Sequence, residues 1–303
     1  MHPPRFQWRH AGRLTAIAVC SLPVSACNIG ILTPQGPIGA AEKSILIDST
    51  GIMLAIVAPT IVAIFGFAWW FRASNTRALY LPEWEYSGRI ELVVWAIPAL
   101  VVMLLGGVTW IGAHDLDPQK PLASSQPPLE VQVVSLDWKW LFLYPDQKIA
   151  TVNTLTIPAG VPVHFSLTSA SVMNAFFIPQ LGTMIYTMNG MTTRLNLQAD
   201  KTGVFHGMSS HYSGDGFADM NFEVHAVAPA EFSDWVNTAG KATATLDQRS
   251  YTELARQSIK VTPANYRLGD PDLFQSIATQ KLPPGPGPQD VSSTSPSGGA
   301  DVR

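Results

Sequence analysis

Two histidines and a methionine lie close together between residues 205 and 220, where they could form part of a metal site. His206 and His211 are five residues apart, and Met220 opens a segment in which apolar and polar residues alternate. A loop of this kind beside a strand is typical of copper sites in small β-barrel electron-transfer domains. Such a site also needs thiolate ligands, and this loop contains no cysteine. The two histidines alone therefore indicate at most weak metal binding.

The chain has two cysteines, Cys20 and Cys27, and both are near its N-terminus. Three arginines within the first 13 residues precede a short apolar run, a pattern typical of a secretory signal peptide. Small residues directly before Cys27 match a lipoprotein cleavage site, so we expect residues 1–26 to be a signal peptide and Cys27 to be lipidated. The alternative is an ordinary signal with an incidental cysteine. Cleavage at Cys27 would leave no free thiol and no disulfide.

Two apolar stretches are each long enough to cross a membrane. Residues 49–71 are 23 consecutive uncharged residues, and a second stretch covers 90–113. At about 1.5 Å per helical residue, each covers a hydrocarbon core of about 30 Å. The loop between them carries Arg72, Arg77 and Arg89, so the positive-inside rule predicts a cytoplasmic loop. We therefore expect a multi-pass protein of the bacterial inner membrane with both chain ends in the periplasm.

Glu91 is a lone charge at the start of the second apolar stretch. One interpretation is a carboxylate stabilised by the helix N-terminal dipole and by interfacial water. The other is a proton-relay group, because ionisable residues in membrane helices are unfavourable and often mark ion pathways. The residues alone leave both interpretations open.

The region at 129–227 is predicted to form a β-sandwich outside the membrane. Val161–Thr168 and Met220–Ala226 alternate apolar and polar residues, which is typical of half-buried strands. Glu130–Tyr144 and Thr192–Gln198 add further strands, and the turns between them suit an antiparallel arrangement.

The same alternation assigns faces to individual side chains. It places His164 and His225 on the outer face, where they are solvated and do not bind a metal. It places Trp138 and Trp140 on one strand face, as a core pair or as an aromatic contact patch.

The remaining segments complete the plan of the chain. Residues 27–44 form a periplasmic segment, 45–113 the membrane hairpin, and 114–128 a Pro/Ser-rich linker. Residues 228–281 are predicted to form a short helical extension, with helices at 230–240, at 251–259 and from Asp270, where Pro271 takes the first helical position. The Pro-, Gly- and Ser-rich residues 282–303 are expected to be disordered. A net charge of -3 gives no basic excess, so we expect no nucleic-acid partner.

Several short motifs stand out within this plan. With the two spans and the sandwich, they make the chain resemble subunit II of the haem-copper oxidases, and it is most similar to the cytochrome bo-type ubiquinol oxidases. The resemblance implies a membrane-anchored all-β protein in which the two-helix transmembrane hairpin precedes a cupredoxin-like Greek-key β-sandwich. The motifs that carry it are Asp137–Trp140, Ser171–Pro179, Gly190–Leu195, Tyr212–Gly214 and Asp270–Phe274.

The resemblance also implies where copper ligands would lie. In the cytochrome c oxidase branch, this domain holds a two-copper centre bridged by two cysteine thiolates. Aligned on Met220, the positions of the other ligands fall on Asn174, Ser209, His211, Ser213 and Phe217. Serine at both thiolate positions removes the soft bridging ligands. The resemblance therefore implies that this chain binds no metal or other cofactor, and that haems and copper belong to subunit I.

The function implied by the resemblance is that of a non-redox subunit II in a proton-pumping ubiquinol oxidase, which oxidises ubiquinol and reduces oxygen to water. Its partners would be subunits I, III and IV and membrane lipid. Glu91 would lie at the entrance of a proton pathway into subunit I. The alternatives are a copper-bearing cytochrome c oxidase subunit II and a free-standing membrane lipoprotein that acts as a binding module.

Overall fold

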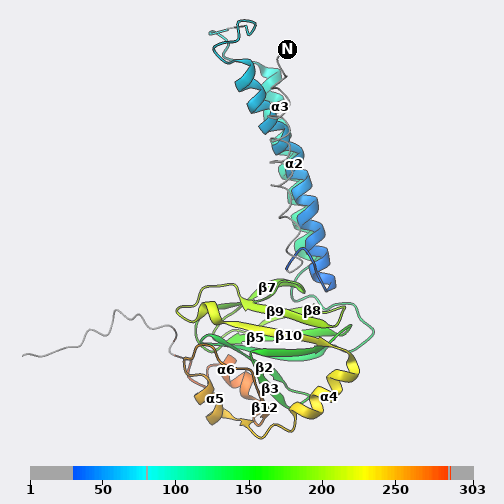
Figure 1. Ribbon diagram of the computed structural model, residues 1–303, viewed down its shortest axis with the longest axis vertical. Coiled ribbons are helices and arrows are strands. Elements are labelled where there is room, and N and C mark those ends of the chain that lie inside the picture. Colours follow the sequence, from blue (N-terminus) through cyan, green and yellow to red (C-terminus); the bar gives the residue numbers. More distant parts are fainter. Residues whose placement is uncertain (1–29, 80, 286, 288–303) are drawn as a thin grey trace, which may run out of the picture.

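Two long apolar helices stand on a β-sandwich (Figure 1). The computed structural model describes residues 30–79, 81–285 and 287, so the predicted signal peptide and Cys27 lie outside the described residues. Within these ranges, α2 (Pro37–Trp70) and α3 (Gly88–Asp115) are the two helices long and apolar enough to cross a membrane. Their apolar side chains are almost all exposed in this chain, which suits a lipid or protein environment.

The helices differ in one respect from the predicted spans. The span predicted at 49–71 lies almost wholly inside α2, but α2 begins twelve residues earlier, at Pro37, directly after Gly36. Proline suits this first helical position because its missing N–H would have no partner there. Part of the predicted periplasmic segment at 27–44 is therefore helical and continuous with the span.

Among the described residues, the strands form a seven-stranded and a five-stranded sheet. The first has the order β11-β12-β3-β2-β1-β5-β8 and the second β4-β10-β9-β6-β7. Most neighbours are antiparallel, as predicted, but three pairs are parallel: β1 with β5, β4 with β10, and β11 with β12. Their bounds are β1 Leu129–Leu136, β2 Lys139–Tyr144, β3 Ile149–Val152, β4 Thr154–Pro158, β5 Pro162–Ser169, β6 Asn174–Ile178, β7 Gly182–Thr187, β8 Thr193–Gln198, β9 Gly203–Ser209, β10 Asn221–Val227, β11 Thr245–Leu246 and β12 Ala264–Leu268.

An aromatic cluster fills the space between the sheets. The rings of Phe176 and Phe222 stack with centroids 5.2 Å apart, and Trp140 meets Phe176 edge-on at 5.4 Å. Phe142 and Phe165 complete this contact, and all five side chains are buried. Aromatic pairs in these geometries stabilise a core beyond the area they bury.

The C-terminal extension contains strands as well as helices, which the sequence did not predict. Its helices are α4 (Pro229–Ala239), α5 (Gln248–Leu254) and α6 (Leu273–Ala278). Between them, β12 pairs with β3 and so enlarges the first sheet. The helix predicted from Asp270 starts at Leu273 instead, because the Asp270 carboxylate accepts a hydrogen bond from the Asp272 N–H and forms a turn.

Helices α5 and α6 of the extension cover the outer face of the seven-stranded sheet, in the lower part of Figure 1, whereas Phe232 and Trp235 of α4 pack against the main core. Tyr251, Leu273, Phe274 and Ile277 form a second hydrophobic cluster with outward residues of β1, β2 and β3. As a result, all six residues of β2 are buried. The described part of the tail beyond residue 281 also packs here: the Gly285 N–H donates to the Ala170 carbonyl at 2.7 Å.

Lys139 lies in β2 beneath this cover. Its ammonium donates hydrogen bonds to the Arg256 carbonyl at 2.6 Å and to Ser258 Oγ at 2.5 Å, and the side chain is fully buried. Burial lowers the pKa of Lys139 from 10.5 to about 8, and the negative charge of Asp137 opposes this shift. The folded chain therefore holds this proton less tightly than the unfolded chain does.

The stability of the chain should rise with pH through the titration of Lys139. Below about pH 8, Lys139 is protonated in both the folded and the unfolded chain. Between about pH 8 and 10.5, only the unfolded chain keeps this proton. The melting temperature of the wild-type chain in detergent, measured relative to Lys139→Met, should therefore increase across this window. A difference that stays constant or decreases with pH would contradict this account of Lys139.

Candidate functional site

The residues that the sequence singles out meet at one end of the sandwich. Asn174 begins β6, Ser209 ends β9, and Met220 directly precedes β10. The loop between β9 and β10 carries Ser213 and the 3-10 helix η2 (Phe217–Asp219). The loop closes on the strands through a hydrogen bond from the Ser209 N–H to the Met220 carbonyl.

Asn174 and Ser209 form a buried polar pair. The Ser209 hydroxyl lies 3.2 Å from Asn174 Oδ1 and 3.2 Å from the His211 carbonyl, and the Ala175 N–H donates to Ser209 Oγ at 3.5 Å. The side-chain amide of Asn174 donates to the Val172 carbonyl. Both side chains are buried, so each needs these partners in place of water.

Ser213 and Met220 form a second buried pair. The Ser213 hydroxyl points at Met220 Sδ, 3.9 Å away, where the thioether is a weak acceptor. The indole N–H of Trp138 donates to the Ser213 carbonyl at 3.0 Å, and that of Trp140 to the Met220 carbonyl at 3.4 Å. Two tryptophans thus hold the backbone of the loop.

The histidines of this region do not converge. His206 is exposed on β9 opposite Glu223, whereas His211 is half-buried against the ring of Tyr186 at 5.8 Å. Phe217 packs edge-on against Tyr212. Across the described residues, no three His, Cys, Asp or Glu side chains are grouped so that they could hold a metal ion.

Trp138 does not lie on the strand face that the sequence predicted. It occupies the turn between β1 and β2 with φ of 62°, a conformation that is strained for a bulky residue. Its ring is 7% exposed and packs directly on Gly216, where an added Cβ would lie 2.5 Å from the indole. Trp138 and Trp140 are therefore both buried, which excludes an exposed contact patch made of these two rings.

The other two predicted outward histidines have partners. His164 Nδ1 lies 2.9 Å from Asn196 Oδ1, and His225 Nε2 lies 3.1 Å from a Glu223 carboxylate oxygen. Both rings are half-buried and outside the core clusters.

Glu91 lies at the other end of the molecule, in the first turn of α3. Its backbone N–H donates to the Ser87 carbonyl, and its side chain is exposed in this chain. Among the described residues, none forms an ion pair or a side-chain hydrogen bond with its carboxylate.

Known proteins share this combination of helices, sandwich and loop. A sequence model of the family described as cytochrome c oxidase subunit II, periplasmic domain, matches residues 141–227. The cytochrome bo(3) ubiquinol oxidase subunit 2 of Pseudomonas aeruginosa is 46% identical over 260 residues, covering 86% of this chain and 78% of that protein. This chain belongs to the ubiquinol oxidase subunit 2 family.

Two further comparisons give a second relative of this family and one similar solved structure. The ubiquinol oxidase subunit 2 of Acetobacter aceti is 45% identical over 86% of this chain and 85% of that protein. The crystal structure of the periplasmic domain of subunit II of cytochrome oxidase of Bradyrhizobium japonicum covers 38% of this chain and 96% of that chain, with 25% identity and a TM-score of 0.36. As a ubiquinol oxidase subunit 2, the chain has two apolar helices followed by a cupredoxin-like sandwich.

The donor set at this end of the sandwich does not fit a copper pair. A mixed-valence pair needs soft thiolate bridges, and the two positions in question carry the hydroxyls of Ser209 and Ser213. Those hydroxyls are occupied by hydrogen bonds to Asn174 and Met220. In this ubiquinol oxidase subunit 2, buried polar pairs thus occupy the positions that the resemblance assigns to copper ligands.

The contact between Trp138 and Gly216 generates a stability prediction. Because the Cβ of Gly216→Ala would overlap the indole, Trp138 must move and weaken its bond to Ser213. Overpacking of this kind costs about 1–3 kcal/mol. We expect a lower melting temperature and red-shifted tryptophan emission, both measured by thermal denaturation followed by fluorescence.

The matched control is Asp215→Ala, at the exposed position next to Gly216. An exposed substitution of this kind changes stability by about 0.5 kcal/mol or less. Equal melting temperatures for Gly216→Ala and Asp215→Ala would show that Gly216 does not hold Trp138 in place.

Proposed function

We propose that this chain is a non-redox subunit II of a proton-pumping respiratory ubiquinol oxidase, a complex that oxidises ubiquinol and reduces oxygen to water. The observation that carries the proposal is the pair of buried serines, Ser209 and Ser213, at the positions of the bridging thiolates. Without thiolates the loop cannot relay electrons through a copper pair. Electrons then have to reach the oxidase from a donor inside the membrane, which is the role of ubiquinol.

The haems and the catalytic copper would belong to subunit I, with subunits III and IV as further partners. This chain would brace subunit I through its two helices, whose apolar side chains are exposed along most of their length. Side chains such as Trp95 at 76% exposure and Val102 at 70% would be buried by neighbouring subunits or by lipid.

Purification of the intact oxidase tests this function. We expect oxygen consumption with a ubiquinol analogue and none with reduced cytochrome c. Metal analysis should account for all copper through subunit I. Oxidation of cytochrome c, or a near-infrared copper band that arises from this chain, would overturn the proposal.

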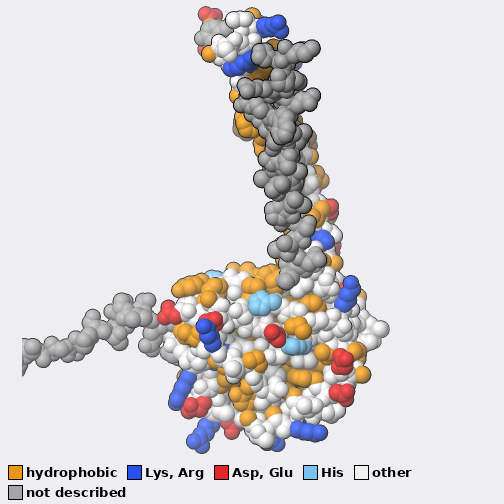
Figure 2. Space-filling view, viewed as in Figure 1, with side chains coloured by type: hydrophobic (Ala, Val, Ile, Leu, Met, Phe, Trp, Pro, Cys, Tyr) orange, Lys and Arg blue, Asp and Glu red, His pale blue; other side chains and the backbone are white. Residues whose placement is uncertain are grey.

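We further propose that the chain lies in the bacterial inner membrane with the sandwich in the periplasm. The support is the loop between α2 and α3, where Arg72, Arg77 and Arg89 concentrate positive charge. Arg72 donates to the Trp69 carbonyl at 2.7 Å and lies over the Trp69 ring, so its charge is held at the end of α2. Figure 2 shows basic side chains in blue, with acidic side chains in red, at this end of the helices, far from the sandwich. Removal of residues 1–26 and lipidation of Cys27 belong to the same proposal.

Glu91 is proposed as a carboxylate at the entrance of a proton pathway into subunit I. It lies one turn into α3, at the cytoplasmic end in the proposed orientation. Its exposed carboxylate has no side-chain partner among the described residues, so a neighbouring subunit can supply one. An ionisable group at this depth is a common feature of proton pathways in membrane proteins.

Glu91→Gln should slow both quinol oxidation and proton uptake, because an amide cannot take up and release a proton. Stopped-flow proton uptake and steady-state oxygen consumption of the intact oxidase measure the two effects. Glu85→Gln is the matched control, since Glu85 is exposed in the loop that directly precedes α3. If Glu91→Gln has wild-type rates, or if Glu85→Gln is equally slow, Glu91 has no special part in proton uptake.

A further inference from the structure

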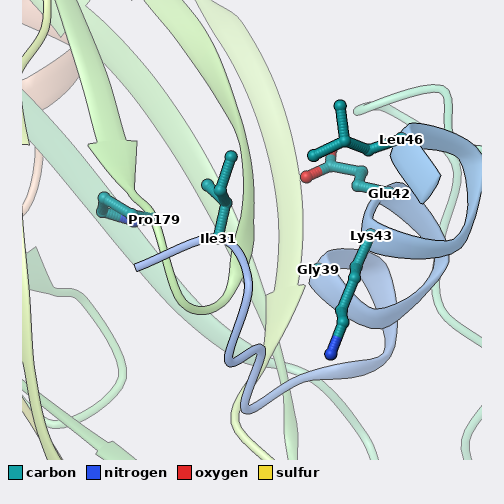
Figure 3. A pocket seen from close by; sticks show the side chains of 6 residues that line it. All are labelled: Ile31, Gly39, Glu42, Lys43, Leu46 and Pro179. Carbon is teal, nitrogen blue, oxygen red and sulfur yellow. The ribbon is translucent and has the colours of Figure 1, made fainter. Parts of the chain in front are cut away.

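A small pocket opens beside the sandwich, at the point where the N-terminal segment enters α2 (Figure 3). Its volume is about 210 Å³, and its walls are Ile31, Gly39, Glu42, Lys43, Leu46 and Pro179. Figure 3 shows the side chain of Ile31 on one side and Leu46 on the other, with the Lys43 ammonium pointing away from Leu46. Ile31, Leu46 and Pro179 form apolar walls, whereas Lys43 and the Glu42 carboxyl group, which points toward Ile31 in Figure 3, form a polar rim.

The walls of the pocket are fixed by the backbone. The Gln35 N–H donates to the Gln180 carbonyl at 2.7 Å, and the Gly39 N–H to the Leu181 carbonyl at 3.1 Å. Gly39 leaves little room for a side chain, because a Cβ there would lie 3.2 Å from the Pro34 ring and 3.3 Å from the Gln180 carbonyl oxygen. The pocket is therefore preformed, and an occupant binds without reorganising the chain.

The depth of the pocket matches the lipid headgroup region. Leu46 precedes the uncharged run that begins at Ser49 by three residues, which is about 5 Å along a helix. The headgroup layer on each side of the hydrocarbon core is about 5–8 Å thick. Ile31 and Leu46 are nevertheless 49% and 42% exposed, so apolar surface here lacks cover from this chain.

The residues that precede Ile31 indicate what occupies the pocket. Ile31 lines the pocket, and Cys27 is only three residues before Gly30. Three residues span at most about 11 Å, so a group on Cys27 is tethered within reach of the pocket. A tether of this kind gives its attached group a high effective concentration at the site.

We infer that an acyl chain attached to the lipidated Cys27 lies in this pocket, between Ile31 and Leu46. The inference rests on the proposed lipidation of Cys27. The apolar walls suit the methylene chain, and each buried methylene stabilises the contact by about 0.8 kcal/mol. The polar rim suits the ester and amide groups of a lipidated cysteine, since the Lys43 ammonium can donate to their carbonyl oxygens. The lipid then holds the N-terminal segment against the sandwich in addition to anchoring it in the membrane.

Photo-crosslinking within the intact oxidase tests the assignment. Benzoylphenylalanine replaces Ile31 or Leu46 in cells fed with labelled palmitate, and mass spectrometry identifies what each probe captures after irradiation. We expect adducts to the acyl group on Cys27 of the same chain. The matched control replaces Ile47, which is 54% exposed and is the next residue on α2 but does not line the pocket. That probe should capture bulk lipid or a neighbouring subunit.

Cys27→Ala should abolish the labelled adduct at Ile31 and leave the adducts at Ile47 unchanged. Capture of bulk phospholipid or of another subunit at Ile31 and Leu46 would overturn the inference. The mass of the N-terminal peptide separates the two proposals. If Cys27 carries no acyl group, the lipidation proposal fails, and the pocket assignment fails with it. If Cys27 is acylated but no adduct joins it to Ile31, only the pocket assignment fails.

Discussion

The docking of the first turn of α2 onto the sandwich sets the geometry of the whole molecule. Gly36 lies so close to β8 that an added Cβ would be 2.0 Å from the Gln198 carbonyl oxygen. Two residues later, Ile38 packs against the main core, and the Asp200 N–H donates to the Gln35 carbonyl at 2.8 Å. A membrane helix and a β-domain are thus joined by backbone contacts. The direction of the sandwich relative to the membrane follows from this joint, and so does the position of the pocket beside it.

The C-terminal extension is the second feature that determines how the sandwich packs. By covering the outer face of the seven-stranded sheet, it turns β2 into a strand that is buried on both sides. An apolar cover explains Leu141 and Leu143, which face away from the main core. It also explains why Lys139 depends on acceptors from residues 256–258, since water cannot reach its ammonium. The extension is therefore part of the same folded domain and is not an appendage.

The sequence was sufficient where one local pattern decides the structure. Uninterrupted apolar runs predicted both helices, and alternation predicted β5 and β10 within one or two residues. The family positions of Asn174, Ser209, Ser213 and Met220 do meet in space. Long-range packing could not be predicted in the same way. In β12, Ala264, Tyr266 and Leu268 alternate with Asn265 and Arg267, but a five-residue alternation does not show that the segment pairs with β3. Trp138 in a positive-φ turn is held by Gly216, which is 78 residues away. No local signal encodes that contact.

The two hydrogen-bonded pairs under the β9–β10 loop also bear on how the protein matures. A metal centre makes folding depend on metal supply and on ligands that stay reduced, because binding energy and folding energy are then the same quantity. Here Ser209 bonds to Asn174 and Ser213 to Met220 through groups that neither oxidise to disulfides nor wait for an ion. The loop can therefore close in oxidising and in copper-free surroundings alike, because none of these four side chains needs a reduced thiol or a metal ion in order to pair.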